Sequence, residues 1–277
     1  MIGTTQKIKP PMWAPGCNLH ELWRGCIGYW PMWEQAGNIA YDLSGWRFNG
    51  ILTGGPSWKV NEFGRAILKD STVQYTDHGF YSALYGVQAL TCLLTFKRLV
   101  STTWARLVSD WSATESYRVI LIDTTGTGGK LTFHIGRGVE YTLNTAISAT
   151  DTGITHTVVG TWDGLTMRFY QDGVQDPSTT ATTPGVLNTG AQTFRLGADQ
   201  TGVNGPQCEL TLGALWNRAL SLREISVLSA DPFCMIRQPT FDWIYAGAIS
   251  RVVAGQPTLK RWGGIPHARQ FSGVRRW

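Results

Sequence analysis

The segment that decides the fold is ITHTVVGTWDGLTMRFYQDG, residues 154–173. Both halves alternate with a period of two, and Asp163-Gly164 joins them. A D-G pair between two such segments is the strongest short-range signal for a β-hairpin, and a second pair, Asp172-Gly173, ends the returning strand. The sequence therefore predicts two antiparallel strands. Their inward face carries Ile154, His156, Val158, Trp162, Leu165, Met167 and Phe169.

Short β-like runs separated by turn residues lie on both sides of this hairpin, at a spacing typical of an all-β sandwich. Only one helix start is convincing: Ser221 to Glu224 is a capping box, and Asp231-Pro232 ends the short helix. The other predicted strands are Ile27–Trp30, Ala66–Leu68, Ala89–Phe96, Tyr117–Ile122 and Leu131–Ile135.

Composition agrees with a β protein that has a real core. Charged residues make up 16% of the 277, against a norm of roughly 25%, and Gly (32) and Trp (13) are abundant. This profile disfavours disorder and long amphipathic helices. No apolar run approaches the roughly 18 residues that span a bilayer, and residues 1–10 lack the apolar region of a signal peptide. We therefore expect no membrane association and synthesis in the cytoplasm of a host cell.

The two ends of the chain differ from its middle. Residues 1–24 and 233–277 are rich in Pro and Trp and show neither helical nor strand periodicity. Six cations and no acid lie between Arg251 and Trp277, and residues 1–30 carry a net charge of +2, so the net +5 of the chain leaves a slightly acidic body. The predicted organisation is an extended N-terminal arm (1–24), a β domain (25–232) and an extended basic C-terminal arm (233–277).

The arms carry the residues that we predict to bind a partner. Arginine and tryptophan are enriched at interface hot spots, and Gly263-Gly264 would let the backbone follow another surface. Two alternatives stay open: the C-terminal arm folds back over its own sandwich, or it is disordered. Nucleic-acid binding is less favoured because nothing here resembles a known reader. The predicted partner-binding residues are Trp13, Trp23, Trp243, Arg261, Trp262, Arg275, Arg276 and Trp277.

Motifs for catalysis are absent from the sequence. Glucan hydrolysis with retention needs two carboxyls about 5 Å apart, yet none of the seven glutamates has a second acid within three residues. An aspartate-based site assembled by folding stays open. The run Gly126–Lys130 lacks the first glycine and the Ser/Thr of a P-loop, so it predicts a hairpin loop. The histidines form no H-x-x-x-H pair, and His156 is predicted to be a core residue.

Five cysteines, an odd number, show neither a C-x-x-C motif nor zinc-like spacing with histidine. We interpret them as buried thiols. Cys17 and Cys26 would close a short loop in an oxidising medium. The remaining three are Cys92, Cys208 and Cys234.

A family resemblance adds to this interpretation. In order along the chain, IGYWPM (27–32), YDLSG (41–45), NG (49–50), FGRA (63–66), TWDG (161–164), YQDG (170–173) and LWNRALS (215–221) resemble laminin-G-like, concanavalin-A-type jelly-roll domains. The resemblance covers residues 25–232. It implies an antiparallel two-sheet jelly-roll sandwich with one short C-terminal helix.

The same resemblance bears on metals and sugars. The family often follows its Gly-Arg-Ala strand with an Asp-Gly turn and a second acid, but here the stretch is KDSTVQY, residues 69–75. No cofactor is predicted, and calcium is the one metal worth inspecting because its oxygen ligands come from separate loops. The candidate ligands are Asp70, Asp163 and Asp199. The simpler interpretation of Asp163 is that it makes the hairpin turn.

Three function classes follow. Compact jelly rolls with adhesive ends are similar in architecture to bacteriophage virion proteins, so the leading hypothesis is a non-enzymatic capsid decoration or cement protein. It would be homo-oligomeric, located on the capsid surface, and bound to the major capsid protein or another virion protein through its arms. The second hypothesis is a glycan-binding module of a phage fibre or tail that recognises a host glycan. The third and weakest is an enzyme.

Overall fold

The computed structural model describes residues 21–101, 104–110, 120–124, 130–137, 139–148, 152–187 and 193–236. The predicted hairpin is confirmed: β12 (Thr155–Trp162) and β13 (Thr166–Gln171) pair antiparallel. The Asp163 carboxylate closes the turn by accepting the backbone N–H groups of Leu165 and Thr166. Asp172 and Gly173 adopt positive φ angles of 51° and 84°, and the chain returns as β14 (Val174–Ala181).

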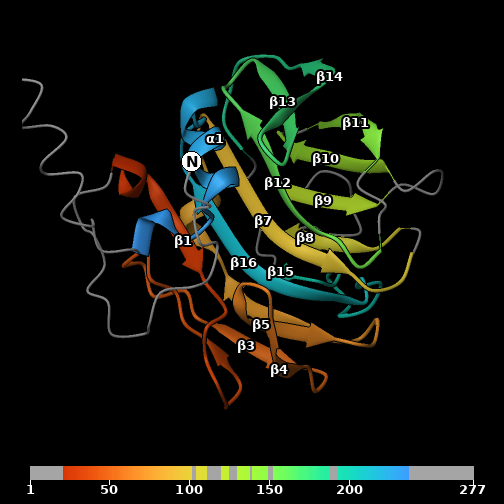
Figure 1. The fold of residues 1–277 in the computed structure, drawn as a ribbon. Coiled ribbons are helices and arrows are strands. Elements are labelled where there is room, and N and C mark those ends of the chain that lie inside the picture. The colour runs from red at the N-terminus through yellow and green to blue at the C-terminus, as the bar shows by residue number, and fades with distance from the viewer. Residues whose placement is uncertain are drawn as a thin grey trace, which may run out of the picture. The chain divides into compact units, whose positions relative to one another are not determined.

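Two antiparallel sheets form a jelly-roll sandwich, as predicted (Figure 1). The first sheet has the order β14-β13-β12-β7-β16-β5-β4, with β1 beside β16. The second has the order β11-β10-β9-β8-β15-β6-β3-β2. The further strands of the first sheet are β1 (Cys26–Trp30), β4 (Ser57–Asn61), β5 (Gly64–Lys69), β7 (Leu90–Arg98) and β16 (Cys208–Trp216). Those of the second are β2 (Ile39–Ala40), β3 (Gly50–Thr53), β6 (Tyr75–Phe80), β8 (Arg106–Asp110), β9 (Ile120–Thr124), β10 (Lys130–Gly136), β11 (Glu140–Ser148) and β15 (Thr193–Leu196).

Four of the strands predicted before the hairpin are confirmed as β1, β5, β7 and β10, each with shifts at its ends. Of the predicted strand Tyr117–Ile122, the part from Ile120 belongs to β9, and residues 117–119 lie outside the described residues, as do residues 126–129 of the glycine-rich run. The helix is confirmed as α1 (Leu222–Ala230), and both reciprocal bonds of the Ser221–Glu224 capping box are present. In the described ranges, no helix is long and apolar enough to cross a membrane.

The main core fills the space between the two sheets. Trp30, Trp162 and Phe133 are fully buried in it. His78 lies in the same core, 4.4 Å from the Trp30 ring between centroids, and burial lowers the pKa of its imidazole to about 4. His156 is buried on the inward face of β12, as predicted, and its Nδ1 lies 2.7 Å from an Asp172 carboxylate oxygen. The His78 imidazole therefore packs in the core in its neutral form.

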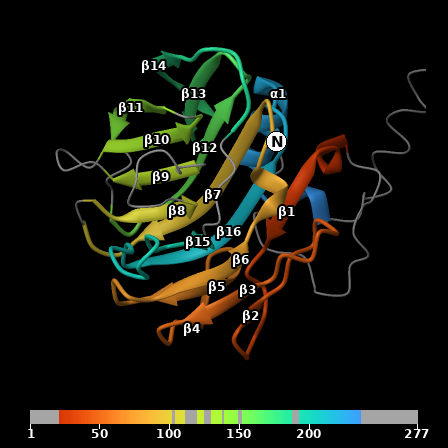
Figure 2. The same cartoon turned by 180° about the vertical axis from the view of Figure 1, so that it is seen from behind.

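A second apolar cluster covers the other face of the first sheet. It includes Leu93, Val159 and Trp216 from the strands and Ile225 and Leu228 from α1. Figures 1 and 2 both show α1 against the first sheet, on the side away from β8–β11. Two short 3-10 helices complete the cover: η1 (Glu21–Trp23) and η4 (Cys234–Ile236), which contribute buried Leu22, Met235 and Ile236.

These two helices change the predicted limits of the domain. Residues 21–24 and 233–236 were assigned to extended arms, but Leu22 and Phe233 are 1% and 0% exposed within the second cluster. The sandwich has an apolar outer face that must be covered, and the chain ends cover it. The body therefore reaches from Glu21 to Ile236, and the remaining arm residues, 1–20 and 237–277, lie outside the described residues.

Packing between the sheets leaves no room beside Gly160. A Cβ at this position would lie 2.9 Å from two atoms of the Phe133 ring. We expect Gly160→Ala to lower the free energy of unfolding by about 1–3 kcal/mol, because overpacking forces the ring to move. Urea unfolding measures the loss. Adding Phe133→Leu should recover part of it in a double-mutant cycle; purely additive effects would show that the ring is not the clashing group.

Candidate attachment site at the chain ends

The two ends of the described body lie side by side on the outer face of the first sheet. The Trp23 indole N–H donates to the Met235 carbonyl at 3.1 Å, and the Tyr29 hydroxyl donates to the Pro232 carbonyl at 3.0 Å. The Trp23 and Tyr29 rings meet edge to face with centroids 5.4 Å apart. Segments that are more than 200 residues apart in sequence are thus tied together, and the described body begins and ends here.

Of the eight predicted partner-binding residues, the structure describes only Trp23. Its indole is partly buried and is used within the body. The other seven, Trp13, Trp243, Arg261, Trp262, Arg275, Arg276 and Trp277, lie outside the described residues.

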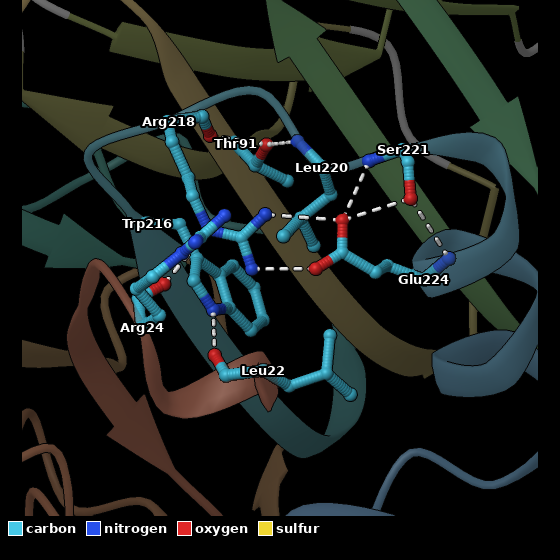
Figure 3. Close-up of polar contacts among 8 residues, drawn as sticks. All are labelled: Leu22, Arg24, Thr91, Trp216, Arg218, Leu220, Ser221 and Glu224. Carbon is cyan, nitrogen blue, oxygen red and sulfur yellow. Dashed lines mark hydrogen bonds and ion pairs between the residues drawn. The ribbon is translucent and has the colours of Figure 1, made fainter. Parts of the chain in front are cut away.

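Arg218 joins the N-terminal segment and helix α1 to the sheet (Figure 3). Its guanidinium makes two hydrogen bonds to the Glu224 carboxylate, at 3.0 and 2.6 Å, and its Nε donates to the Arg24 carbonyl at 2.7 Å. A bidentate arginine–carboxylate pair is strong and fixes geometry as well as charge. Arg218 therefore holds the N-terminal segment and the first turn of α1 in one arrangement.

Three further hydrogen bonds complete this anchor (Figure 3). The buried Trp216 indole donates to the Leu22 carbonyl at 2.7 Å. The Thr91 hydroxyl of β7 donates to the Arg218 carbonyl at 2.8 Å and accepts the Leu220 backbone N–H at 2.9 Å. Together with the Arg218–Glu224 pair, these bonds form what we call the terminal anchor: Leu22, Arg24, Thr91, Trp216, Arg218, Leu220, Ser221 and Glu224.

A groove of about 540 Å³ lies beside α1 on the same face. One wall is the second half of α1 with Pro232, and the other is the β13–β14 turn. The Asp172 side chain in this turn is about half exposed and binds the buried His156. The groove is lined by Phe63, Thr155, Thr157, Asp172, Gly173, Val174, Ser226, Ser229, Ala230 and Pro232.

Folding brings two glutamates together beside this groove, which the linear spacing of acids could not reveal. Lys97 lies 3.0 Å from Glu62 and 3.1 Å from Glu209, and Lys59 also pairs with Glu209. Burial opposes ionisation of both acids, but a hydrogen bond from Thr155 on Glu62, and bonds from Lys59 and Lys97 on Glu209, lower the pKa of each carboxyl. Neither is the protonated acid that glycoside hydrolysis requires.

The three candidate calcium ligands do not converge. Asp163 lies near the first end of β7, because the preceding Trp162 pairs with Leu90. Asp70 lies toward the other end, because the preceding Lys69 is in the same cross-strand row as Arg98. The Asp199 carboxylate accepts bonds from Thr201, Val203 and Asn204 within its own loop. Asp163 pairs with Arg168 as well as closing its turn. Within the part of the chain that the structure describes, no three acids, histidines or cysteines are grouped to hold a metal.

The outer face of the second sheet carries a polar row. Asp77 and Arg195 are cross-strand neighbours on β6 and β15, and Ser109 of β8, on the other side of Arg195, is buried. Arg195 pairs with Asp77 at 3.1 Å and lies over the Tyr75 ring at 4.9 Å from its centroid. Arg195 also donates to the Asp199 carbonyl at 2.8 Å, so its guanidinium contacts Asp77, Tyr75 and the Asp199 loop at once.

The cysteines that the structure describes are free thiols. Cys26, Cys92 and Cys208 are buried, as predicted, and Cys234 is only partly buried. Cys17 lies outside the described residues.

Comparison with known proteins agrees with this architecture. The family model of the concanavalin A-like lectin/glucanases superfamily matches residues 70–226, more than half of the chain. The chain belongs to this superfamily. No curated protein matches it.

Solved structures with low identity share the fold. The binding domain of Paraclostridial Mosquitocidal Protein 1 is 13% identical with a TM-score of 0.60, over 76% of this chain and 52% of that one. Domain 4 of AbnA, a GH43 extracellular arabinanase from Geobacillus stearothermophilus in complex with arabinotriose, is 15% identical with a TM-score of 0.60, over 74% and 98%. A Trypanosoma rangeli sialidase is 12% identical with a TM-score of 0.57, over 78% of this chain and 34% of that one.

This chain thus spans about half of the mosquitocidal binding domain and about a third of the sialidase, but nearly all of the arabinanase domain. At these identities the likeness concerns the fold.

The terminal anchor makes stability depend on pH. Hydrogen bonds from Arg218 lower the pKa of Glu224 from 4.5 to about 2, so the stabilisation is present above pH 4.5 and is lost as pH falls toward 2. We expect Glu224→Gln to be less stable than wild type by about 1–2 kcal/mol at pH 6 and nearly equal to it at pH 2. Urea unfolding at both pH values measures this.

Asp70→Asn, at an exposed aspartate, is the control for a general acid effect. A Glu224→Gln deficit that stayed constant from pH 6 to pH 2 would contradict the ion pair as its cause.

Proposed function

We propose that this protein is a non-enzymatic virion structural protein of the capsid decoration or cement type. Its terminal arms attach it to the major capsid protein, another virion protein or neighbouring copies on the capsid surface, and it acts as a homo-oligomer. The observation that carries the proposal is the common origin of both arms. The chain enters and leaves the body on one face of the sandwich, where Trp23 binds Met235.

The terminal anchor supports an attachment role mechanically. An arm that binds another surface transmits force to the body, and the force is resisted only if the base of the arm is fixed. Arg218 and Trp216 hold the Arg24 and Leu22 carbonyls at 2.7 Å each. On the C-terminal side, Phe233 and Ile236 are buried in the same cluster.

The chemistry of the arms supports binding to an acidic or apolar surface. The segment from Arg251 to Trp277 has six cations, no acid and two tryptophans. Indole burial supplies apolar stabilisation at roughly 25 cal/mol per Å², and arginine forks bind carboxylates in a bidentate geometry.

A non-enzymatic role is supported by the way the body uses its acids. Glu62 and Glu209 are neutralised by lysines, Glu224 by Arg218, and Glu140 binds His134. These carboxylates hold strands and the helix together. None of these four glutamates is therefore free to act on a substrate.

Replacing the end of the C-terminal arm tests the proposal in the full chain. We expect the triple change Arg275→Ala, Arg276→Ala and Trp277→Ala to lower occupancy on purified capsids by about tenfold or more, because hot-spot residues of these types contribute about 2 kcal/mol or more each. Occupancy is read by quantitative electrophoresis of sedimented particles. Arg65→Ala, on the body, is the matched control. Unchanged loading of the triple variant would refute attachment through this arm.

Glycan binding is the alternative, and the polar row on the second sheet favours it. Related folds are named as binding domains or carry arabinotriose. This alternative predicts specific glycan-array binding by the wild-type protein and at least a tenfold loss in Arg195→Ala, which removes the cation above Tyr75. Lys130→Ala, at an exposed lysine of the same sheet, is the control. An array with no bound glycan, with and without calcium, would exclude this alternative.

A further inference from the structure

Two cations lie in the interior at one end of the first sheet. Arg98 on β7, Cys208 on β16 and Lys69 on β5 form one cross-strand row, because Cys208 is opposite both cations. They are 1%, 2% and 0% exposed. Cys208 belongs to the main core, so the row faces the space between the two sheets.

Lys69 is held in a fitted cradle. Its Nζ donates to the Gly197 carbonyl at 2.8 Å and to the Pro206 carbonyl at 3.3 Å. Gly197 has a positive φ of 88°, and a Cβ there would lie 1.9 Å from Nζ. The carbonyls satisfy hydrogen bonds of the ammonium group but bring no negative charge.

Arg98 has no such partners. Its Nε, Nη1 and Nη2 are all buried and none makes a hydrogen bond. A guanidinium group stays protonated in proteins, and burying a charge without a counter-charge is costly. Among the carboxylates in the described ranges, none pairs with Arg98 or Lys69.

The opposite face of the same strands shows how this sheet normally treats its cations. Lys97, next to Arg98, points outward and pairs with Glu62 and Glu209, and Lys59 pairs with Glu209 as well. Two lysines on the solvent side thus receive two carboxylates, whereas the two cations on the buried side receive a thiol.

The Cys208 thiol does not supply the missing charge. Lys69 and Arg98 act to lower the pKa of this thiol, but burial outweighs them and raises it above the usual value. The group is therefore a neutral thiol at physiological pH, and the row keeps an uncompensated positive charge.

We propose that Arg98 and Lys69 form an internal binding site for a small inorganic oxyanion of the sulfate and phosphate class. The guanidinium of Arg98 presents parallel N–H groups that match two oxygens of such an anion. Lys69, two strands away in the same row, supplies a second N–H donor group. Burial lowers the pKa of its amine, and an anion beside it favours the protonated form. Because the row is closed off from solvent, the anion is taken up during folding and exchanges slowly.

The test uses the full chain, refolded from urea with radioactive sulfate and then desalted. We expect about one retained sulfate per chain, with competition by phosphate during refolding. Protein refolded with sulfate should melt about 3–6 °C above protein refolded with sodium chloride at equal ionic strength, as for a ligand that binds only the folded state.

Variants identify the residues. Arg98→Met should abolish sulfate retention and the sulfate-specific shift, and Lys69→Met should reduce retention at least tenfold. Cys208→Ser keeps both cations and should retain sulfate. Lys59→Met removes a cation from the outer face and should also retain it, which controls for general salt effects.

Wild-type protein that retains neither sulfate nor phosphate would overturn the proposal, whatever the variants do. So would thiolate absorbance near 240 nm at pH 7 that is lost in Cys208→Ser, because the counter-charge would then be the cysteine. Retention by Arg98→Met equal to that of wild type would show an adventitious ion only.

Discussion

The structure depends on one constraint: the neighbouring strands β1 and β16 of the first sheet are buried on both faces. All nine residues of β16 and all five of β1 are buried. The inward residues pack against the second sheet, as in any sandwich. The outward ones, such as Leu93, Val159 and Trp216, need a separate cover. Helix α1 and the two chain ends provide it. Arg218 holds α1 and the N-terminal segment, and Trp23 and Tyr29 hold the C-terminal end.

This constraint links packing to the proposed function. In a jelly roll with a polar outer face, the chain ends would not need to pack on that face and could lie apart from each other. Here both ends are drawn onto one apolar surface, so Trp23 and Met235 come into hydrogen-bond contact. In the proposed function, two arms that start from one place would bind one partner surface together, and the second binding event would benefit from a high effective concentration. The sandwich would supply rigidity, and the arms would supply recognition.

The sequence was sufficient for the fold where local rules operate. The D-G turns, the alternation along β12 and β13, and the Ser221–Glu224 capping box each act within a few residues, and the structure contains all of them. The domain limits could not be predicted in the same way. Leu22 and Phe233 are buried only because the outer face of a sheet built from distant strands needs them, and neither segment has a periodicity of its own.

The candidate site was less accessible to sequence reasoning for the same physical reason. Arg218 lay in a quoted family motif, but its partners, Arg24 and Glu224, come from the far end of the chain and from α1. The acids followed the same pattern: Glu62 and Glu209 share Lys97 although 147 positions of sequence separate them. Ion pairs between strands depend on register, which linear spacing does not give.

Register also explains why neighbouring residues of one strand have opposite electrostatic environments. Cys208 and Glu209 are adjacent on β16 but point to opposite faces. Glu209 meets Lys59 and Lys97 on the outer side, whereas Cys208 meets Lys69 and Arg98 within the core. Elsewhere in this sheet the alternation separates apolar from polar residues. Here it separates Lys59 and Lys97, which have carboxylate partners, from Lys69 and Arg98, which have none among the described residues. A hydrophobic residue at position 98 would continue the row of Phe96 and Leu94 into the core. The buried arginine therefore lowers the stability of the fold unless a counter-charge lies at its guanidinium.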